Sequence, residues 1–548
     1  MSTPKGTSPT TTLRLPGVTF IDALIHGIKW GALNGTATIT YSFPWTTGES
    51  SFYGYAGSSD YSDAKEPTAG THTALSVEQQ NATKAALQAW ANVADVQFIQ
   101  VADNSSSAGD IRVAWTSATD KTSVGSTAWG WAYRPSDSYP VGGDIWISGT
   151  GQKSNPAWNV GSYNYESLMH EIGHALGLKH TFEGNVVLPT ALDNNQYSIM
   201  SYTGITNDLF RTITYDSGGK PTFSFQHIVP ETPMVFDIAA MQYLYGANNS
   251  YHTGDDVYTF DPSTPFLKTI WDAGGNDTIS VANFTMACVI DLTPGNYSDI
   301  RMVSAPNPPG YTGGTVPTYD GRDNLGIAFG TYIENAIGGA GDDLLYGNKI
   351  NNTFTGNGGN DRIDGDQGLD TAMYNGIHNN YTVTTSGVTT TVKAKVGSEG
   401  TDSLINVERL HFSDENIALD ISGVAGQAYR LYQAAFDRKP DLKGLGYWIA
   451  DMDKGSSLTT VAAGFMQSAE FQALYGNKPS NTVLVTNFYQ NVLHRTPDKA
   501  GFDYWLDQLN TNKITAAGAL ASFCESTENQ ALVIGSIQNG IEYLVWGA

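Results

Sequence analysis

The sequence predicts a multidomain α+β protein: a mixed α/β domain, then a parallel β-roll, then an all-α C-terminal domain. Three observations support this prediction. The 548 residues are too many for one hydrophobic core. Gly fills 59 positions, and from about 270 to 376 the composition shifts to Gly, Asn and Asp. From residue 421 onward, Ala, Leu and aromatic residues recur at helical spacing. We expect a disordered leader over 1–16, the α/β domain over 17–248, the roll with an adjoining β-sandwich over 249–420, and the helical domain over 421–548.

Composition excludes several classes of protein. The chain has 29 basic and 53 acidic residues, so its formal net charge is −24. A nucleic-acid partner is not expected, because phosphate binding needs basic patches. Bound cations could neutralise so acidic a surface. Cys288 and Cys524 cannot form a disulfide framework. No stretch of 18 apolar residues is present, so no membrane span is expected, and the N-terminus lacks the apolar core of a secretory signal peptide.

The first folded part predicts alternating helices and strands. Residues 1–16 are rich in Ser, Thr and Pro, which is typical of disorder. Residues 76–93 place Ala82, Ala86, Ala89, Trp90 and Val93 on one helical face, and Ser76 with Gln79 forms a capping box. A second helix is expected over residues 165–178. Strands are expected over residues 96–101, 110–115, 126–133 and 143–148.

The strongest motif runs from His170 to His180, with the sequence HEIGHALGLKH. On a helix, His170 and His174 project from one face toward a common point. Glu171 points about a hundred degrees away, so it can reach a water bound to the metal but does not act as a ligand. Gly177 allows the chain to turn back and bring His180 to the ion. Three neutral nitrogens and one open position are typical of a catalytic Zn²⁺, whereas structural zinc sites usually close the fourth position.

A second motif follows in Tyr197-Ser198-Ile199-Met200-Ser201-Tyr202. Met200 on a tight turn is expected beneath the metal, with its side chain against the imidazoles. The long zinc motif and this Met-turn together resemble the metzincins, and Ser-Ile-Met-Ser-Tyr is similar to the serralysin version. The resemblance covers roughly residues 20–420 and implies a metzincin-type mixed α/β catalytic domain. It also implies that Tyr202 is a further zinc ligand that swings away to stabilise the oxyanion.

The mechanism implied is hydrolysis of peptide bonds. Zinc lowers the pKa of its water and polarises the carbonyl, Glu171 acts as the general base, and Tyr202 shares the oxyanion charge. The segment 126–133 corresponds to the edge strand that pairs with extended substrate in metzincins. The chain departs from the resemblance at Thr181, because serralysins usually carry Pro after the third His. A second departure is expected at the N-terminus, where a recognisable propeptide is missing or reduced to a short leader, so the means of latency stays open.

Residues 338–373 divide into four nine-residue units, GGAGDDLLY, GNKINNTFT, GNGGNDRID and GDQGLDTAM. This repeat predicts a parallel β-roll that binds several Ca²⁺ ions, roughly two to five. The glycines turn the backbone, the sixth residue supplies an oxygen ligand, and the eighth residue fills the core. The expected ligands are Gly338, Gly339, Ala340, Gly341, Asp343, Asn352, Gly356, Gly358, Asp361 and Asp370. The resemblance adds Asp272, Gly274, Asp277 and Glu334 as outlying calcium ligands.

Calcium is abundant outside cells, so these sites favour an exported protein. Proteins with such repeats, called RTX proteins, leave by type I secretion with an uncleaved C-terminal signal, and Glu542-Tyr543-Leu544-Val545 faintly resembles the serralysin ending. We therefore expect a secreted, calcium-stabilised zinc endopeptidase, one Zn²⁺, protein or peptide substrates, contact with the secretion machinery, and a monomer. Two alternatives are an RTX adhesin or surface-binding protein and a metzincin outside the serralysin branch.

The helical tail is duplicated at a constant offset of 57 residues. Tyr432, Arg438, Asp441 and Trp448 recur as Tyr489, Arg495, Asp498 and Trp505. Such a repeat predicts paired helical units that share one core. The tail resembles a domain of unknown function found at the C-termini of some RTX and surface proteins. Attachment, targeting and secretion all stay open as its role, and the sequence predicts neither the cleavage preference nor the physiological substrate.

Overall fold

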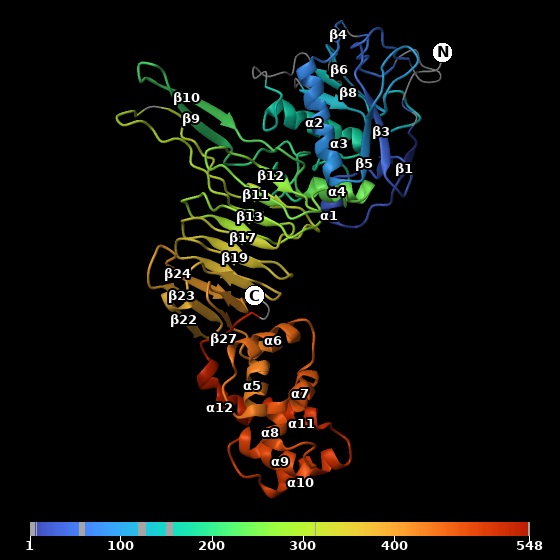
Figure 1. Cartoon of the computed structure of the whole chain (residues 1–548). Coiled ribbons are helices and arrows are strands. Elements are labelled where there is room, and N and C mark those ends of the chain that lie inside the picture. The colour runs from blue at the N-terminus through green and yellow to red at the C-terminus, as the bar shows by residue number, and fades with distance from the viewer. Residues whose placement is uncertain are drawn as a thin grey trace. The chain divides into compact units, whose positions relative to one another are not determined.

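The computed structural model describes residues 6, 8–53, 61–68, 70–118, 128–148, 157–312 and 314–545. The chain divides into two units (Figure 1). The first unit comprises Met1–Asn283 and Cys288–Ile333, and the second comprises Phe284–Ala287 and Glu334–Ala548. The predicted boundaries at 248 and 420 do not coincide with this division, because residues 288–333 pack with the N-terminal part of the chain.

The core of the first unit is a mixed sheet with the order β5-β3-β6-β8-β7. Strands β3, β5, β6 and β8 run parallel, whereas β7 lies antiparallel to β8 at one end of the sheet. A short strand, β4, pairs antiparallel with β6. The strands are β3 (Ala37–Ser42), β4 (His72–Thr73), β5 (Val96–Gln100), β6 (Ile111–Thr116), β7 (Gly130–Ala132) and β8 (Ile145–Ser148).

Two helices cross this sheet and pack against each other, α2 (Val77–Val93) and α3 (Tyr163–Leu176) (Figure 1). The capping box predicted at Ser76 is confirmed, since Ser76 and Gln79 bond each other in both directions. Helix α2 buries Trp90 completely, as its spacing predicts. The strand predicted over 126–133 is shorter than expected, being confined to β7, and residues 126–127 lie outside the described part of the chain.

The predicted disorder of residues 1–16 is wrong for Thr10–Thr12. These residues form β1, which pairs antiparallel with β2 (Ile28–Trp30). The preceding residue Ser8 donates from its N–H and its hydroxyl to the carboxylate of Asp110, at 3.0 and 2.8 Å. Composition could not indicate this, because the partners lie 16 to 102 residues away in the sequence. Residues 1–5 and 7 are outside the described ranges.

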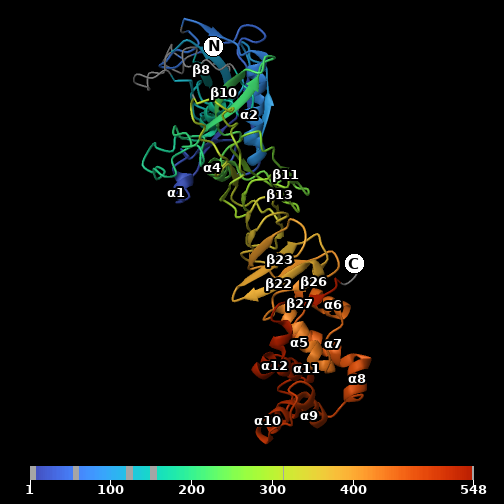
Figure 2. The same ribbon diagram turned by 90° about the vertical axis from the view of Figure 1, so that its left-hand side faces the viewer.

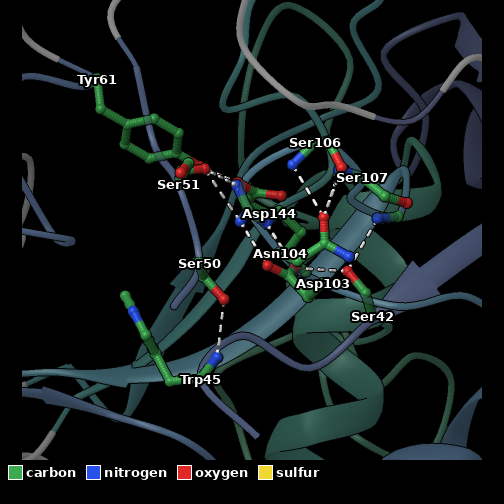
Figure 3. A network of polar contacts seen from close by, with 12 residues as sticks. Ser42, Trp45, Ser50, Ser51, Tyr61, Asp103, Asn104, Ser106, Ser107 and Asp144 are labelled. Atoms are coloured by element: carbon green, nitrogen blue, oxygen red, sulfur yellow. Dashed lines mark hydrogen bonds and ion pairs between the residues drawn. The ribbon is translucent and has the colours of Figure 1, made fainter. Parts of the chain in front are cut away.

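A buried ion pair joins β6 to the segment that follows β5. Arg112 donates to both carboxylate oxygens of Asp103 at 2.9 and 2.8 Å. Asp103 also accepts from the Ser42 hydroxyl (Figure 3). The Arg112 guanidinium donates to the carbonyl of Ser51 at 3.2 Å as well. Because both charges are shielded from water, losing either partner would cost about 3–5 kcal/mol. This network fixes the loop that follows β3.

The first unit continues beyond the Met-turn with a hairpin and a helix that the sequence did not predict, and then with short strands inside the predicted 249–420 β-region. A long hairpin of β9 and β10 precedes helix α4, which contacts helix α1. Parallel pairs form between β11 and β13 and between β12 and β16. Their bounds are α1 (Thr19–Asp22), β9 (Leu209–Tyr215), β10 (Pro221–His227), α4 (Val235–Tyr245), β11 (Val257–Thr259), β12 (Lys268–Ile270), β13 (Thr278–Ser280), β14 (Val289–Asp291), β15 (Tyr297–Ser298) and β16 (Leu325–Ile327).

The second unit begins with short parallel strands. Paired residues lie 18 positions apart, as in Leu345↔Ile363 and Phe354↔Ala372, so two nine-residue units complete one turn. All four of these side chains are at most 1% exposed. This is the strand arrangement and the core that the repeat predicts. The strands are β17 (Asn335–Ile337), β18 (Leu344–Tyr346), β19 (Thr353–Thr355), β20 (Arg362–Asp364) and β21 (Thr371–Met373).

Antiparallel strands follow the repeats, as the sandwich prediction expects. Strands β22 (Tyr381–Ser386), β23 (Thr389–Ala394) and β24 (Thr401–Ile405) form a meander, and the short helix η1 (His378–Asn380) precedes it. Strand β25 (Arg409–His411) pairs with β26 (Asn416–Ala418).

The tail is helical, but the all-α prediction is wrong at its end. The last described residues include β27 (Ile541–Tyr543), which pairs antiparallel with β26. Alternating burial, with Ile541 and Tyr543 buried and Glu542 exposed, suits a strand. The helices are α5 (Val424–Phe436), α6 (Leu442–Asp453), α7 (Leu458–Gln467), α8 (Ala469–Tyr475), α9 (Asn481–Asn491), α10 (Lys499–Asn510), α11 (Ala516–Cys524) and α12 (Thr527–Ile537).

The duplication is structural as well as sequential. Asp441 caps α6 by accepting from the N–H of Gly444, and Asp498 caps α10 by accepting from that of Gly501. In each copy the repeated arginine pairs with a glutamate, at 2.6 Å for Arg438–Glu470 and 2.7 Å for Arg495–Glu528. Across the described residues, no helix combines the length and the apolar character that crossing a membrane requires.

Candidate metal centre

Helix α3 carries His170 and His174 one turn apart and ends at Leu176, two residues after His174. Gly177 terminates the helix with φ +113°, and its N–H donates to the carbonyls of Gly173 and His174. A Cβ at Gly177 would lie 2.3 Å from the backbone oxygen of Ile28. Only glycine suits this left-handed, crowded position, and the turn directs the chain back toward the helix.

The three histidines of the motif lie together. One ring nitrogen from each of His170, His174 and His180 falls within 4.8 Å of the others, and the two Nε2 atoms of His174 and His180 are 3.0 Å apart. Each Nδ1 atom has its own oxygen partner: Ile199 O at 2.7 Å, Leu178 O at 3.0 Å and Glu183 Oε1 at 2.6 Å, respectively. Because a hydrogen bond at Nδ1 fixes the tautomer, the Nε2 lone pairs are left for a metal.

Burial keeps the imidazoles of His170 and His174 neutral. Burial, with a smaller effect from His180, lowers the pKa of His170 to about 4. Burial also lowers the pKa of His174 well below its ordinary value, and the neighbouring histidines act in the same direction. Neutral nitrogens are the form that binds a metal. The donor set therefore fits Zn²⁺, for which three protein ligands and one open position are typical of catalytic sites.

Lys179 holds the loop that delivers the third histidine. Its ammonium donates to the backbone carbonyls of Ala23 at 2.7 Å, Glu183 at 2.5 Å and Val186 at 3.0 Å. All three donors of a buried cation are thereby satisfied. The carboxylate of Glu183, in turn, faces His180. Glu183 therefore contacts Lys179 through its backbone carbonyl and His180 through its side chain.

The Met-turn lies beneath α3. Met200 is fully buried, and a Cβ on Gly173 would lie 2.8 Å from its sulfur. The carboxylate of Asp237, from the first turn of α4, accepts from the Ser198 hydroxyl at 2.6 Å and from the N–H of Ile199 at 2.8 Å. It also accepts from the N–H of residue 234 at 2.9 Å. Burial raises the pKa of Asp237 to about 7, against these bonds.

Thr181, where the resemblance leads one to expect Pro, has a definite role in the structure. The residue is fully buried, and its hydroxyl donates to Asp193 Oδ1. The same oxygen accepts from the Ser201 hydroxyl at 2.6 Å. Asp193 therefore connects the loop of the third histidine to the Met-turn through two side chains.

Glu171 and Tyr202 differ in their exposure to solvent. Glu171 is 7% exposed and belongs to the buried face of α3. Tyr202 is 71% exposed, with its ring centroid 4.6 Å from that of His180 and 5.7 Å from that of His170. One side chain is dehydrated and the other borders solvent, so the histidines can be approached from the Tyr202 side.

The predicted calcium ligands of the repeats form two columns of buried side chains. In the first column, the N–H of Asp343 donates to Asp361 Oδ1 at 2.8 Å, and the N–H of Asp361 donates to Asp402 Oδ1 at 3.0 Å. In the second column, the N–H of Asn352 donates to Asp370 Oδ1 at 2.7 Å, and the N–H of Asp370 donates to Glu408 Oε2 at 2.9 Å. The four repeat members are at most 1% exposed.

Two oxygens of these columns mark places for a cation. Oδ2 of Asp361 and Oδ2 of Asp370 are buried and have no hydrogen-bond partner within the described ranges. Burial, opposed by a backbone hydrogen bond and reinforced by neighbouring carboxylates, raises the pKa of both groups to about 7. A Cβ at Gly356 would clash with Asp361 Oδ2, and one at Gly365 with Asp370 Oδ2. Hard, buried oxygens suit Ca²⁺.

The glycine-rich positions are partly engaged by the following turn. The carbonyl of Gly338 accepts from the Asn357 amide at 2.8 Å, and that of Gly339 from the N–H of Gly358 at 3.0 Å. The N–H of Ala340 donates to the carbonyl of residue 284. A Cβ at Gly341 would collide with residues 286 and 287.

The outlying ligands occur in both units. In the first, Asp272 accepts from the N–H of Gly274 at 2.9 Å and from the Tyr258 hydroxyl at 2.5 Å, and Asp277 accepts from the N–H of Asp256 at 2.8 Å. In the second unit, the backbone carbonyl of Glu334 accepts from the side-chain amide of Asn352 and from the N–H of Thr353.

Sequence reasoning missed several residues of the site. These are Glu183, Asp193, Asp237, Asp402 and Glu408. Only Glu183 had a local signal, because it follows His180 by three positions and can reach its ring. The acids at 402 and 408 lie beyond the regular repeats.

The site and the fold together define a class of protein. A helix with two histidines, a glycine turn, a third histidine and a methionine turn beneath them is the arrangement of a metzincin. Residues 68–203 match the family model described as matrixin, and residues 236–308 match the one described as peptidase M10 serralysin C terminal.

The chain is similar to serralysin from Proteus mirabilis, with 31% identity over 345 residues, 58% of this chain and 61% of the relative. It is similar to metalloprotease AprA from Pseudomonas entomophila, with 33% identity over 354 residues, 60% and 63% of the two chains. Serralysin C from Dickeya chrysanthemi is 34% identical over 293 residues, 48% and 52%. The aligned part thus spans about three-fifths of the length of the first of these relatives.

The predicted resemblance to serralysin-type metzincins is confirmed by these matches. The helical tail matches a domain of unknown function over residues 425–475 and 462–533. The two overlapping matches agree with the duplication found in the sequence.

Proposed function

We propose that this protein is a zinc metalloendopeptidase. The observation that carries the proposal is the set of three imidazoles, each with Nδ1 hydrogen-bonded so that Nε2 can bind one ion, beside the helix that carries Glu171. The matches to matrixin and to serralysins support it. A binding protein would have no use for such a set with an adjacent buried carboxylate.

The residues of the chain divide the chemistry among them. His170, His174 and His180 would hold Zn²⁺, which when bound polarises the scissile carbonyl and lowers the pKa of water. Glu171 accepts the proton of the attacking water and returns it to the leaving amine. Tyr202, close to two of the histidines, donates a hydrogen bond to the oxyanion that develops.

The substrate class follows from the edge of the sheet. Strand β7 ends the sheet order of the first unit and, among the residues that the structure describes, pairs on one side only, with β8. An extended polypeptide can add to such an edge through main-chain hydrogen bonds. We infer extended or unfolded protein segments as substrates, cleaved next to the three histidines.

Calcium completes the proposal for the second unit. Ca²⁺ bound along each column, by Asp343 and Asp361 in the first and by Asn352 and Asp370 in the second, would give the two buried carboxylate oxygens a partner. The glycine-rich backbone carbonyls are further ligands. We propose that these ions stabilise the repeats. We also propose that the protein is secreted as a monomer by the type I route to the outside of the cell, where calcium is plentiful.

Glu171→Gln tests the proposed chemistry. The variant should keep its zinc and lose casein hydrolysis by about 10²- to 10⁴-fold, the usual contribution of a general base. Glu183→Gln is the matched control: it removes a carboxylate beside His180, so zinc affinity falls about 10- to 100-fold while activity at saturating zinc is retained. Full turnover by the Glu171 variant would eliminate the mechanism.

Calcium removal tests the second unit. Hydrogen exchange should show loss of protection over residues 338–373 after a calcium chelator is added, and recovery on adding calcium back. Unchanged exchange and unchanged circular dichroism in excess chelator would contradict the calcium proposal while leaving the zinc proposal intact.

A further inference from the structure

Three side chains of the second unit lie together outside the sites described above. Candidate ligand atoms of His378, Glu415 and Glu542 all fall within 4.8 Å of one another. His378 Nδ1 is 2.6 Å from Glu415 Oε1. The three residues come from η1, from the turn before β26 and from the final strand β27, which lies beside β26 (Figure 2).

Strand register explains why the two glutamates meet. Glu542 is paired with Ile417, and Glu415 precedes Ile417 by two residues. Because Glu415 lies in the turn that leads directly into β26, this register brings its side chain close to that of Glu542. The N–H of His378 donates to Asp414 Oδ1 at 2.8 Å, and its ring packs 5.1 Å from that of Phe412. These contacts fix the imidazole over the same turn.

The electrostatics of the cluster favour a cation. The side chains of His378 and Glu415 are 21% and 20% exposed, so both are partly removed from water. Two carboxylates held this close repel each other unless a positive charge lies between them. An imidazole with two carboxylates suits Zn²⁺ and related transition metals, whereas Ca²⁺ prefers oxygen ligands alone.

We propose that His378, Glu415 and Glu542 form a transition-metal site that fastens β27 to the β25–β26 hairpin. This site is separate from the histidines of α3 and does not depend on the proposed protease activity. Strand β27 pairs over only three residues. A metal that binds only when β27 is docked stabilises that state by mass action, so the end of the chain becomes metal-responsive.

Counting zinc equivalents tests the proposal. The full-length protein, saturated with calcium, is titrated with Zn²⁺ alone by isothermal calorimetry. His378→Ala should bind one equivalent fewer than the wild type. His494→Ala is the matched control, because His494 lies 3.9 Å from Asp437 outside the cluster, and it should bind as many equivalents as the wild type.

A second variant and a second readout make the test decisive. Glu542→Gln alters an exposed side chain, and it too should lose one equivalent. In the wild type, Zn²⁺ should slow amide exchange over residues 541–543 at least tenfold, and in either cluster variant it should not. The proposal is overturned if the cluster variants bind as much zinc as the wild type. It is also overturned if zinc does not slow amide exchange in β27 of the wild type. If His378→Ala does not fold, the count for Glu542→Gln decides. None of these readouts requires hydrolysis, so a failure of the protease proposal would be seen separately.

Discussion

Replacing Asp237 by Ala should loosen the Met-turn. The substitution leaves two buried backbone N–H groups and one buried hydroxyl without their acceptor. Each unsatisfied buried donor costs about 1–3 kcal/mol. Removal of a carboxylate whose pKa is raised to about 7 by burial returns part of that cost. We expect a net loss of about 3–5 kcal/mol, a large share of the roughly 5–15 kcal/mol that stabilises a domain.

The same change should reach the metal centre. The carbonyl of Ile199 is the partner of His170, and the N–H of Ile199 is held by Asp237. A displaced turn would misorient the ring and lower zinc affinity about 10- to 100-fold. Urea unfolding in excess zinc gives the stability, and competition with a chromogenic chelator gives the affinity.

Asp216→Ala is the matched control. Asp216 also accepts from two backbone N–H groups, those of Gly218 and Lys220, both at 2.9 Å, but it lies in the exposed turn of the β9–β10 hairpin. Water can replace it there, so the loss should stay below about 1 kcal/mol. Equal losses for the two variants, or a loss below about 1 kcal/mol for Asp237→Ala, would refute the reasoning.

Three further outcomes are expected. Gly177→Ala should cost about 1–3 kcal/mol in urea unfolding, because φ is +113° and Ile28 crowds the Cβ, and an unchanged midpoint would contradict this. Thr181→Val should cost about 1–3 kcal/mol and weaken zinc binding, whereas Thr181→Ser should not, since only Val removes the donor to Asp193. Phe354→Ala should cost about 3–5 kcal/mol in calcium-saturated protein, and a loss under about 1 kcal/mol would place Phe354 outside the core.

Features written in short stretches of sequence could be predicted. The zinc motif, the capping box at Ser76 and the nine-residue units each depend on spacing within one helix or one turn. Helix geometry places His170 and His174 on one face, and the repeat places Phe354 in the core. The structure brings ring nitrogens of His170 and His174 together and buries Phe354 completely.

Features that depend on distant partners could not. Asp237 reaches the Met-turn from a helix that starts more than thirty residues after Met200, and no periodicity marks it. Thr181 looked like a departure from the expected pattern, and only the three-dimensional contact with Asp193 gives it a role. The strand at Ile541–Tyr543 was missed because three residues carry no pattern of their own and take their conformation from β26.

The hydrogen bonds of the two columns all point the same way along the chain. The amide of Asp343 needs the carboxylate of Asp361, and the amide of Asp361 needs that of Asp402. A turn of the roll is therefore completed by residues that come later in synthesis and in sequence. A chain cut between residues 373 and 402 would retain every repeat, yet its last turn would end in amides with nothing to accept them. Such a fragment would unfold from that end, because the irregular segment after the repeats supplies the acceptors for the last turn.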